Sequence, residues 1–434
     1  MTYNTGTFTL ENSTHLWLEI PESDRSSIWE QKPPVTSVGA IIMTYNTGAF
    51  TLENSTHLWL EIPESDRSSI WEQSLAYSAD NRRWMAYLNR LCLNAFLPWL
   101  QEEYAPNAAV FPNPAGCESI WEVVNGTGIS LGDKRLVLIP TEAVDLSEFR
   151  VPQEWVDIPS WSADYYLAVQ VNLEEGCIRV WGYTTQVQLK NMGTYDERDR
   201  AYCLDGDKLI SNLNILWMAR QICPEEVTRT QTAPIPALSL TQTENLLQRL
   251  GNPGVILPRL AVPFTIWGAL LEHGGWRQRL YEQRQGMPQQ WSILQWMQTG
   301  VSDFAQKFGW GSVELQTSAE GARGSQQTSA LPTLVKNIIL NGQQYQLRLQ
   351  PKGNIEERIW RFELRSQTNG ELIPTGVKLI LLTEDLQPFA GNQAQATTPV
   401  NMLYIEVALS DAGEGLVWQI EPTPEDYECE ILFF

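Results

Sequence analysis

The chain has 434 residues, a formal net charge of −21, 43% hydrophobic residues and 10% aromatic residues. This length suffices for two or three domains with their own cores, and the apolar content excludes a largely disordered chain. The negative charge argues against broad nucleic-acid binding, where cations on phosphates supply most of the affinity, and against an anionic membrane surface. We therefore expect a globular protein with no nucleic-acid or membrane partner.

The sequence indicates a soluble cytoplasmic protein. The first ten residues, MTYNTGTFTL, have neither a basic start nor an apolar core, so no secretion signal is expected. The most apolar run, residues 255–271, contains two prolines and an arginine and is too short to span a bilayer. The cysteines lie far apart without a CxxC pair, which favours free thiols in a reducing compartment. They are Cys92, Cys117, Cys177, Cys203, Cys223 and Cys429.

The start of the chain is duplicated. Residues 1–31 and 43–73 are identical except that Thr7 in the first copy is matched by Ala49 in the second. A solenoid needs several repeats to close a core, so a single extra copy does not indicate a solenoid. We expect the fold to have one position that either of the two segments could fill. The second copy continues directly into the next helix, so we expect it to dock and residues 1–42 to form an undocked arm. A recent duplication and a start codon assigned too early both produce this pattern.

Residues 43–227 predict an α+β domain. An extended segment over residues 50–62 leads into a helix opened by Pro63, because proline and acidic residues favour the first helical turn. The following helix should end near Tyr104 and carries an amphipathic stripe. The stripe consists of Trp84, Leu88, Leu91 and Ala95.

The second half of this predicted domain contains strand and helix patterns. A strand is predicted over residues 135–140. Apolar residues alternate in residues 167–173 and 177–183 on either side of a turn that ends at Gly176, which predicts a hairpin. An apolar face at helical spacing predicts a helix over residues 207–223.

Residues 240–312 predict a helical section after a linker rich in proline and threonine. A short helix over residues 241–250 comes first, and two longer helices follow. The second of these should run from Trp291 to Phe308, because apolar residues recur there at spacings of three and four. The stripe consists of Trp291, Leu294, Met297, Val301, Phe304 and Phe308.

Residues 333–434 predict an antiparallel β-sandwich. The small and polar residues 317–332 before it are typical of a flexible linker, which we expect a protease to cut. Apolar and polar residues alternate in residues 360–365, 403–409 and 427–433, a period typical of strands with one buried and one solvated face. About seven such runs are separated by turn residues. These turns are Asn341-Gly342, Asn369-Gly370 and Gly413-Glu414-Gly415.

Several segments together resemble one family. They are THLWLEIPESDRSSIWEQ, RRWMAYLNRLCLNAFLPWLQEE, CLDGDKLISNLNILWMARQ, LLEHGGWRQRLYEQRQG, LILLTEDLQPFAGN and EVALSDAGEGLVWQIEP. Over about residues 43–434 the chain is similar to the domain of unknown function 1822 family of cyanobacteria. The resemblance implies no assigned activity and no catalytic residues. Family genes are said to lie near alternative sigma factors and signalling proteins, which implies regulation. Residues 1–42 depart from the family pattern.

Histidine is nearly absent, which limits catalytic chemistry. His15 and His57 are copies of one position, and His273 is the third histidine. A Cys–His dyad or a Cys/His zinc site would have to use one of them, and no ligand spacing supports it. We therefore expect structural roles. The sequence also has no GxSxG elbow for a serine nucleophile, so no catalytic residue is predicted.

Two further patterns suggest a ligand at first sight. The glycines of NGTGISLG do not form GxGxxG within a strand–loop–helix unit, so a surface turn is expected. The acidic run over residues 196–207 lacks the alternating ligands of an EF-hand loop, and helix capping by Asp205 or Asp207 is the expected role of its end. No metal and no cofactor is predicted. The glycines are Gly126, Gly128 and Gly132.

Tryptophan is common, with 18 residues, and several lie in residues 264–332, which carry no net charge. Core packing and partner contact are the two interpretations, because aromatic residues and arginine are enriched in interface hot spots. Trp291 belongs to the helical stripe and should be buried, whereas Trp296 lies off the stripe and should face a partner. The candidate partner-binding residues are Trp276, Arg277, Arg279, Arg284, Trp296 and Trp310.

These observations favour an α+β multidomain protein that acts in the cytosol by binding another protein and not as an enzyme. The resemblance implies regulation together with an alternative sigma factor or a signalling partner. One alternative is a hydrolase whose site uses two carboxylates in a cleft, although no pattern pairs two carboxylates. Another is a structural subunit of a larger assembly.

Overall fold

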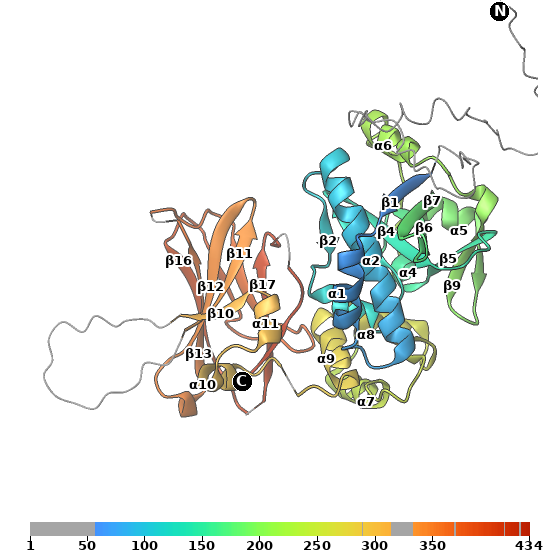
Figure 1. Ribbon diagram of the computed structural model, residues 1–434. Helices are drawn as coiled ribbons and strands as arrows, with labels where there is room; N and C mark the ends of the chain where they lie inside the picture. Colours follow the sequence, from blue (N-terminus) through green and yellow to red (C-terminus); the bar gives the residue numbers. More distant parts are fainter. Residues whose placement is uncertain (1–56, 289, 314–332, 369, 412, 425–426) are drawn as a thin grey trace, which may run out of the picture.

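The computed structural model describes residues 57–288, 290–313, 333–368, 370–411, 413–424 and 427–434. These residues form a mixed α/β structure with eleven α-helices and several mainly antiparallel sheets. Sheet and helices from the first half of the chain lie to one side, and the C-terminal strands lie to the other, as Figure 1 shows. No helix in this described part is both long and apolar enough to cross a membrane.

The first half of the chain combines two sheets with six helices. Its elements are β1 (Leu58–Glu61), α1 (Glu64–Ser74), α2 (Asp80–Glu103), β2 (Ala109–Phe111), α3 (Gly116–Trp121), β3 (Thr127–Leu131), β4 (Lys134–Thr141), β5 (Glu148–Pro152), α4 (Glu154–Asp157), β6 (Tyr165–Asn172), β7 (Cys177–Thr185), α5 (Gln186–Met192), β8 (Thr194–Asp196), β9 (Ala201–Asp205) and α6 (Leu213–Ile222). Six strands form a sheet in the order β1-β7-β6-β4-β3-β2, in which only the β4–β6 pair is parallel. A smaller sheet has the order β5-β9-β8.

The described part of the second copy, residues 57–73, is docked in the fold, as predicted. Its strand β1 pairs with β7 in antiparallel register, and its helix α1 packs on α2, with Ile62 and Ile70 both buried. The first copy and the predicted protease site in residues 317–332 lie outside the described residues.

The predicted helix over residues 207–223 is too long. Ile210 pairs with Tyr183 through backbone hydrogen bonds of 2.9 and 3.0 Å, which holds the chain extended there. Helix α6 then begins after Asn212, whose side chain accepts a hydrogen bond from the backbone N–H of Asn214 at 3.0 Å. Tertiary pairing and an N-cap therefore delay the helix start.

The middle section contains five helices in the described residues. They are α7 (Leu240–Leu250), α8 (Phe264–Glu272), α9 (Gly274–Arg284), α10 (Ile293–Thr299) and α11 (Asp303–Lys307). The continuous helix predicted from Trp291 to Phe308 is wrong. Gly300 has φ +93°, which ends α10, and the Ser302 hydroxyl caps α11 by accepting from the N–H of Ala305 at 3.2 Å. Both breaks use residues that favour helix ends.

The C-terminal strands form two antiparallel sheets. The strands are β10 (Trp310–Val313), β11 (Thr333–Leu340), β12 (Gln343–Pro351), β13 (Ile359–Ser366), β14 (Lys378–Thr383), β15 (Gln393–Gln395), β16 (Met402–Ala408), β17 (Gly415–Glu421) and β18 (Ile431–Phe433). One sheet has the order β10-β11-β12-β13-β16, and the other has the order β15-β14-β17-β18. The first sheet thus begins with a strand from the section that the sequence analysis assigned to helices.

Local patterns predict most of these strands. In β13 the expected alternation buries Trp360 and Phe362, and Asn341 and Gly342 have the positive φ of a tight hairpin. The strand predicted over residues 427–433 is wrong for its first half, since β18 begins only at Ile431.

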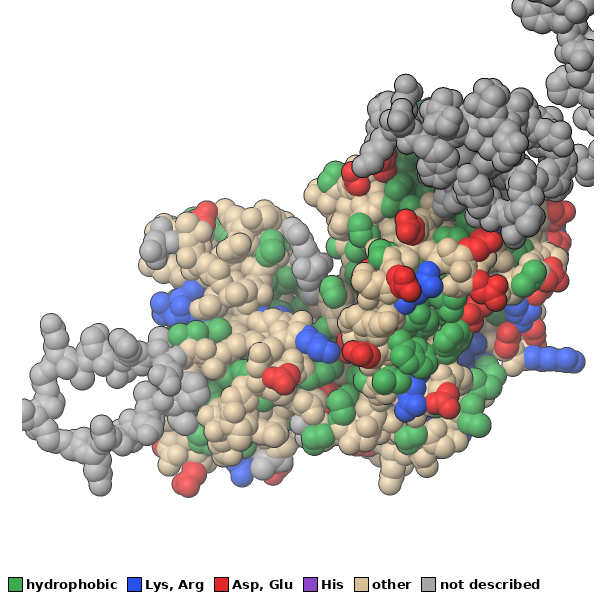
Figure 2. Space-filling model, viewed as in Figure 1, with side chains coloured by type: hydrophobic (Ala, Val, Ile, Leu, Met, Phe, Trp, Pro, Cys, Tyr) green, Lys and Arg blue, Asp and Glu red, His purple; other side chains and the backbone are tan. Residues whose placement is uncertain are grey.

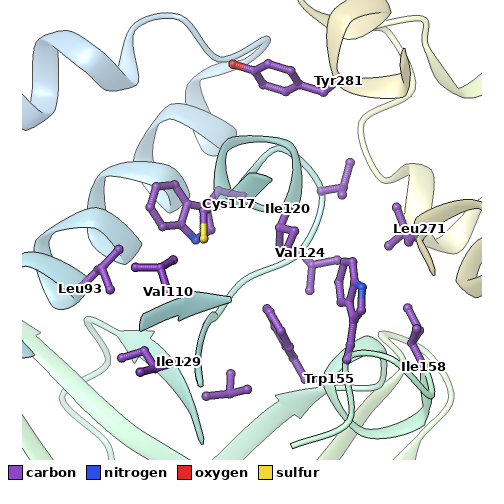
Figure 3. Packing of buried hydrophobic residues seen from close by; sticks show 14 of the residues in the cluster. Leu93, Val110, Cys117, Ile120, Val124, Ile129, Trp155, Ile158, Leu271 and Tyr281 are labelled. Atoms are coloured by element: carbon purple, nitrogen blue, oxygen red, sulfur yellow. The ribbon is translucent and has the colours of Figure 1, made fainter. Parts of the chain in front are cut away.

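A hydrophobic core continues from the six-stranded sheet into the middle helices. Figure 3 shows Ile120 of α3 lying between Val110 and Ile129 on the sheet side and Leu271 of α8 on the other. Tyr281 of α9 lies above α3 in this view. The middle section is therefore packed against the first half of the chain and shares its hydrophobic core.

Candidate functional site

The six residues predicted to bind a partner are packed inside the chain. Five of them are between 1% and 3% exposed, and the side chain of Arg279 is 16% exposed. The expectation that Trp296 lies on the surface is wrong. These residues lie on α9, α10 and β10, where the first half of the chain meets the C-terminal strands. Figure 2 shows the two parts in contact below and separated above in this view. The five buried residues are Trp276, Arg277, Arg284, Trp296 and Trp310.

Arg284 connects α9 to α3 through a buried ion pair. Its Nε lies 2.8 Å from Oε1 of Glu122, and both side chains are at most 1% exposed. Glu122 also accepts a hydrogen bond from Nε2 of Gln285 at 2.8 Å and one from the hydroxyl of Ser78. The other end of the guanidinium donates to the carbonyl of Leu250 at 3.0 Å. A charge pair with this many partners fixes the position of a helix.

The other two arginines connect α9 to the C-terminal part. Arg277 pairs with Glu428, and its Nη1 donates to the carbonyl of Leu271 at 2.6 Å. Nη1 of Arg279 lies 2.5 Å from Oε1 of Glu384, in the loop after β14. Because α9 is held on both sides, its cations have a structural role.

Trp296 and Trp310 belong to a buried cluster around Glu430. Their ring centroids lie 5.7 Å apart. Nε1 of Trp310 donates to Oε2 of Glu430 at 2.9 Å, and Nε1 of Trp418 donates to the same oxygen at 3.2 Å. Lys336 pairs with the other carboxylate oxygen. Trp296 is buried here because β10 follows α11 and places Trp310 against it.

His273 and Cys429 lie close together, but their charges do not suit a catalytic dyad. The thiol sulfur is 3.8 Å from Nε2 of His273. Burial lowers the pKa of His273 to about 4 and raises the pKa of the Cys429 thiol to about 12. Both groups are therefore neutral near pH 7, whereas a nucleophilic cysteine needs a thiolate. His273 instead caps α9 by accepting from the N–H of Trp276 at 3.3 Å, a structural role as expected.

Glu282 on α9 makes stability depend on pH. Burial raises its pKa from the ordinary 4.5 to about 7, so the folded chain binds a proton more tightly than the unfolded chain does. This stability is fully present below pH 4.5 and is lost as pH rises through 7. We expect the free energy of unfolding, measured by urea relative to Glu282→Gln, to fall by about 3 kcal/mol across this window. A difference that stays constant with pH would contradict the shifted pKa.

The acidic run is held by ion pairs, and most of the glycine-rich segment is buried. Arg150 neutralises the first part of the run by pairing with Asp196 at 2.7 Å. Asp205 pairs with Lys208 at 2.6 Å and its side chain does not cap the short helix that follows, so the capping prediction is wrong for this residue. No group of three or more His, Cys, Asp or Glu side chains in the described part could hold a metal ion. The surface turn predicted for the glycines holds only for Gly132, because Gly126 and Gly128 are buried.

Gly126 is required by both its backbone and its surroundings. It has φ +117°, and a Cβ there would lie 2.6 Å from Nε1 of Trp155. We expect Gly126→Ala to lower the free energy of unfolding by about 3 kcal/mol, through positive φ and the clash together. Gly132→Ala is the matched control, since its φ is +72° and nothing lies within 4 Å. It should cost about 1 kcal/mol. If urea titrations show that both variants lose the same free energy of unfolding, the clash with Trp155 does not contribute.

Helix α6 presents apolar side chains on two faces. Its inner face buries Leu216 and Trp217, and the ring of Trp217 stacks on Tyr104 at the end of α2 with centroids 4.7 Å apart. Ile215, Met218 and Ile222 form an outer ridge and are 47%, 56% and 72% exposed. The exposed face of a surface helix is ordinarily polar, so three large apolar side chains on it are unusual.

A second group of exposed apolar side chains lies on α1 and α2, and its rings already contact partners within the chain. Trp71 and Trp84 lie edge-on with ring centroids 5.9 Å apart, and Trp71 also contacts Tyr87. Nε1 of Trp84 donates to a carboxylate oxygen of Glu142. These rings are 39% and 37% exposed, so the α6 ridge is the better candidate for a docking surface.

Comparison with known protein families shows the family to which the chain belongs. A family model described as "Protein of unknown function (DUF1822)" matches residues 60–433. The chain belongs to this family. No curated protein and no solved structure matches the chain. The suspected resemblance is thereby confirmed, and the matched residues begin within β1 and end within β18.

The described part of this DUF1822 protein has a small cavity and an open groove. A cavity of about 10 Å³, room for about one water, lies between α9 and residues 428–433. An open groove of about 800 Å³ runs beside α7, and its only carboxylate side chain is Glu244. The ridge on α6 is thus the strongest candidate site in the described residues. The apolar face predicted for this helix did not include the ridge, although Ile215, Met218 and Ile222 recur in the sequence at spacings of three and four.

Proposed function

We propose that this DUF1822 protein binds another protein in the cytoplasm through the outer ridge of α6. The observation that carries the proposal is the exposure of Ile215, Met218 and Ile222 on a helix whose inner face is already packed. Exposed apolar patches on soluble domains mark interaction sites. A helical ridge with anchors at i, i+3 and i+7 fits an apolar groove on its partner.

Charges around the ridge specify the partner further. The hydroxyl of Tyr104 lies 3.2 Å from the side-chain oxygen of Asn214, which places the end of α2, with exposed Glu102 and Glu103, beside the start of α6. Two more exposed glutamates, Glu225 and Glu226, follow the helix. We infer a partner whose groove has lysine or arginine at its rim. With a net charge of −21 on the whole chain, association should be faster at low salt.

We also propose that the two C-terminal sheets pack on each other as a β-sandwich. Phe434, which follows β18 in one C-terminal sheet, contacts Trp360 and Phe362 of β13 in the other, with ring centroids 4.9 and 6.0 Å apart. This contact supports two sheets packed face to face as a β-sandwich. We also propose that the protein has a regulatory role. An alternative sigma factor or a signalling protein is therefore the first partner to test.

A hydrolase with two carboxylates gains no comparable support. Its carboxylates would need to face each other across an open cleft. Five of the six buried glutamates in the described residues pair with arginine or lysine. The sixth, Glu282, lies beside Gln278, and its pKa is raised by burial and not by a second carboxylate. Among the described residues that line the α7 groove, Glu244 is the one carboxylate side chain. The paired acids and their cations are Glu122 with Arg284, Glu154 with Arg259, Glu363 with Arg365, Glu428 with Arg277 and Glu430 with Lys336.

The test compares capture by matched variants. Met218→Glu/Ile222→Glu places charges on the ridge, and Val144→Glu/Ile256→Glu makes the same changes at positions that are 92% and 69% exposed elsewhere. We expect the wild type and the control to capture the same protein in stoichiometric amounts from native lysate, and the ridge variant to lose at least about tenfold of it, since buried charge is costly. Equal capture by the ridge variant, or no stoichiometric partner at all, would contradict the proposal.

A further inference from the structure

We infer that the first copy of the duplicated segment can replace the second copy in the fold of the same chain. The place in question, defined here as the exchange site, is the surface of β7 and α2 on which β1 and α1 dock. Its alternative occupant is residues 16–31. This inference does not rest on the proposed function, because it concerns the contacts of β1 and α1 and not the outer ridge of α6.

The contacts that hold the second copy use side chains that the first copy also has. Strand β1 pairs with β7 from Leu58 to Glu61. Nη1 of Arg67 donates to the carbonyl of Leu173 at 3.0 Å, and Ile70 is 3% exposed. Each of these positions has an identical residue in the first copy, forty-two positions earlier in the chain. The counterparts are Leu16 to Glu19, Arg25 and Ile28.

The location of the exchange site allows one segment to leave without opening the core. Strand β1 is the edge of its sheet and pairs only with β7 among the described strands. Helix α1 lies on the outside of α2 and has only Ile70 and Ser74 buried. Edge strands are the elements that exchange most readily between chemically identical segments.

Connectivity determines which copy docks in the native sequence. Ser74 follows the second copy directly, and its hydroxyl donates to the carbonyl of Ile70 at 2.8 Å. When the first copy docks, residues 32–73 must form a closed loop. Loop closure of this length leaves the first copy docked in on the order of one molecule in a few hundred. The exchange is thus a minor state that damage to the second copy makes the major one.

Four full-length chains test the exchange: the wild type, Ile28→Asp, Ile70→Asp and the double variant. An aspartate at the buried position cannot dock without leaving its charge unpaired. We expect Ile28→Asp to melt like the wild type, and Ile70→Asp to melt between the wild type and the double variant. Hydrogen exchange followed by mass spectrometry reports the occupant, because the substitution itself distinguishes two otherwise identical peptides.

In Ile70→Asp, the first-copy peptide with its native Ile28 should exchange at least about tenfold more slowly than the second-copy peptide of the same chain. The second-copy peptide, which carries the substitution at position 70, should exchange quickly. Rapid exchange of both peptides, with Ile70→Asp melting no higher than the double variant, would overturn the inference. Protection that appears only in a concentration-dependent dimer would overturn it as well, since the first copy would then dock on a neighbouring chain.

Discussion

Replacing Arg284 with methionine is expected to lower the free energy of unfolding by about 3–5 kcal/mol. Methionine keeps much of the apolar volume but leaves the carboxylate of Glu122 without its paired cation at a site where that side chain is 0% exposed. The hydrogen bonds from Gln285 and Ser78 remain, and they do not neutralise the charge. Urea unfolding at pH 7, followed by tryptophan fluorescence, measures the loss.

Two further variants separate the buried charge from the loss of contacts. Arg83→Met removes the pair with Asp80, whose side chain is 98% exposed, and should cost under about 1 kcal/mol. Arg284→Met combined with Glu122→Gln should recover part of the loss, because a neutral amide costs less to bury than a lone carboxylate. A cost for Arg284→Met no larger than that of the surface control would show that the buried pair does not hold α9.

Trp296→Ala is expected to lower the free energy of unfolding by about 3–5 kcal/mol, as large-to-small core changes do. Its side chain is 1% exposed and packs on Trp291 and Trp310, and its Nε1 donates to the carbonyl of Gln290 at 2.8 Å. Trp71→Ala is the matched control at a tryptophan that is 39% exposed, and it should cost less than half as much. A Trp296 variant that unfolds like the wild type would restore the surface role that the helical stripe suggested.

Short-range patterns account for the part of the fold that could be predicted. Helix α2 ends where expected, at Tyr104, because the apolar spacing and the stop signal lie within one segment. The β6–β7 hairpin and the turn at Asn341-Gly342 follow from alternation and from residues that tolerate positive φ. The docking of residues 57–73 follows from their direct continuation into the next helix, which is also a local property.

Long-range pairs account for the part that could not. Alternation over residues 427–433 put the glutamates on a wetted face, yet Glu428 and Glu430 are buried against Arg277 and Lys336. Those cations come from elements that are remote in the sequence, and periodicity carries no information about them. Trp296 is buried for the same reason, because Trp310 reaches it from a strand that belongs to the C-terminal sheet.

Photocrosslinking from α6 tests the central claim most directly, because it records which molecule touches the ridge. A photoreactive phenylalanine analogue is placed at Met218, and the same analogue at Val144 serves as the control. The account predicts a crosslink from position 218 to one other protein, at residues lining an apolar groove with a basic rim, and no such product from position 144. Crosslinks from position 218 that reach only residues 1–56 of the same chain, or equal products from both positions, would contradict it.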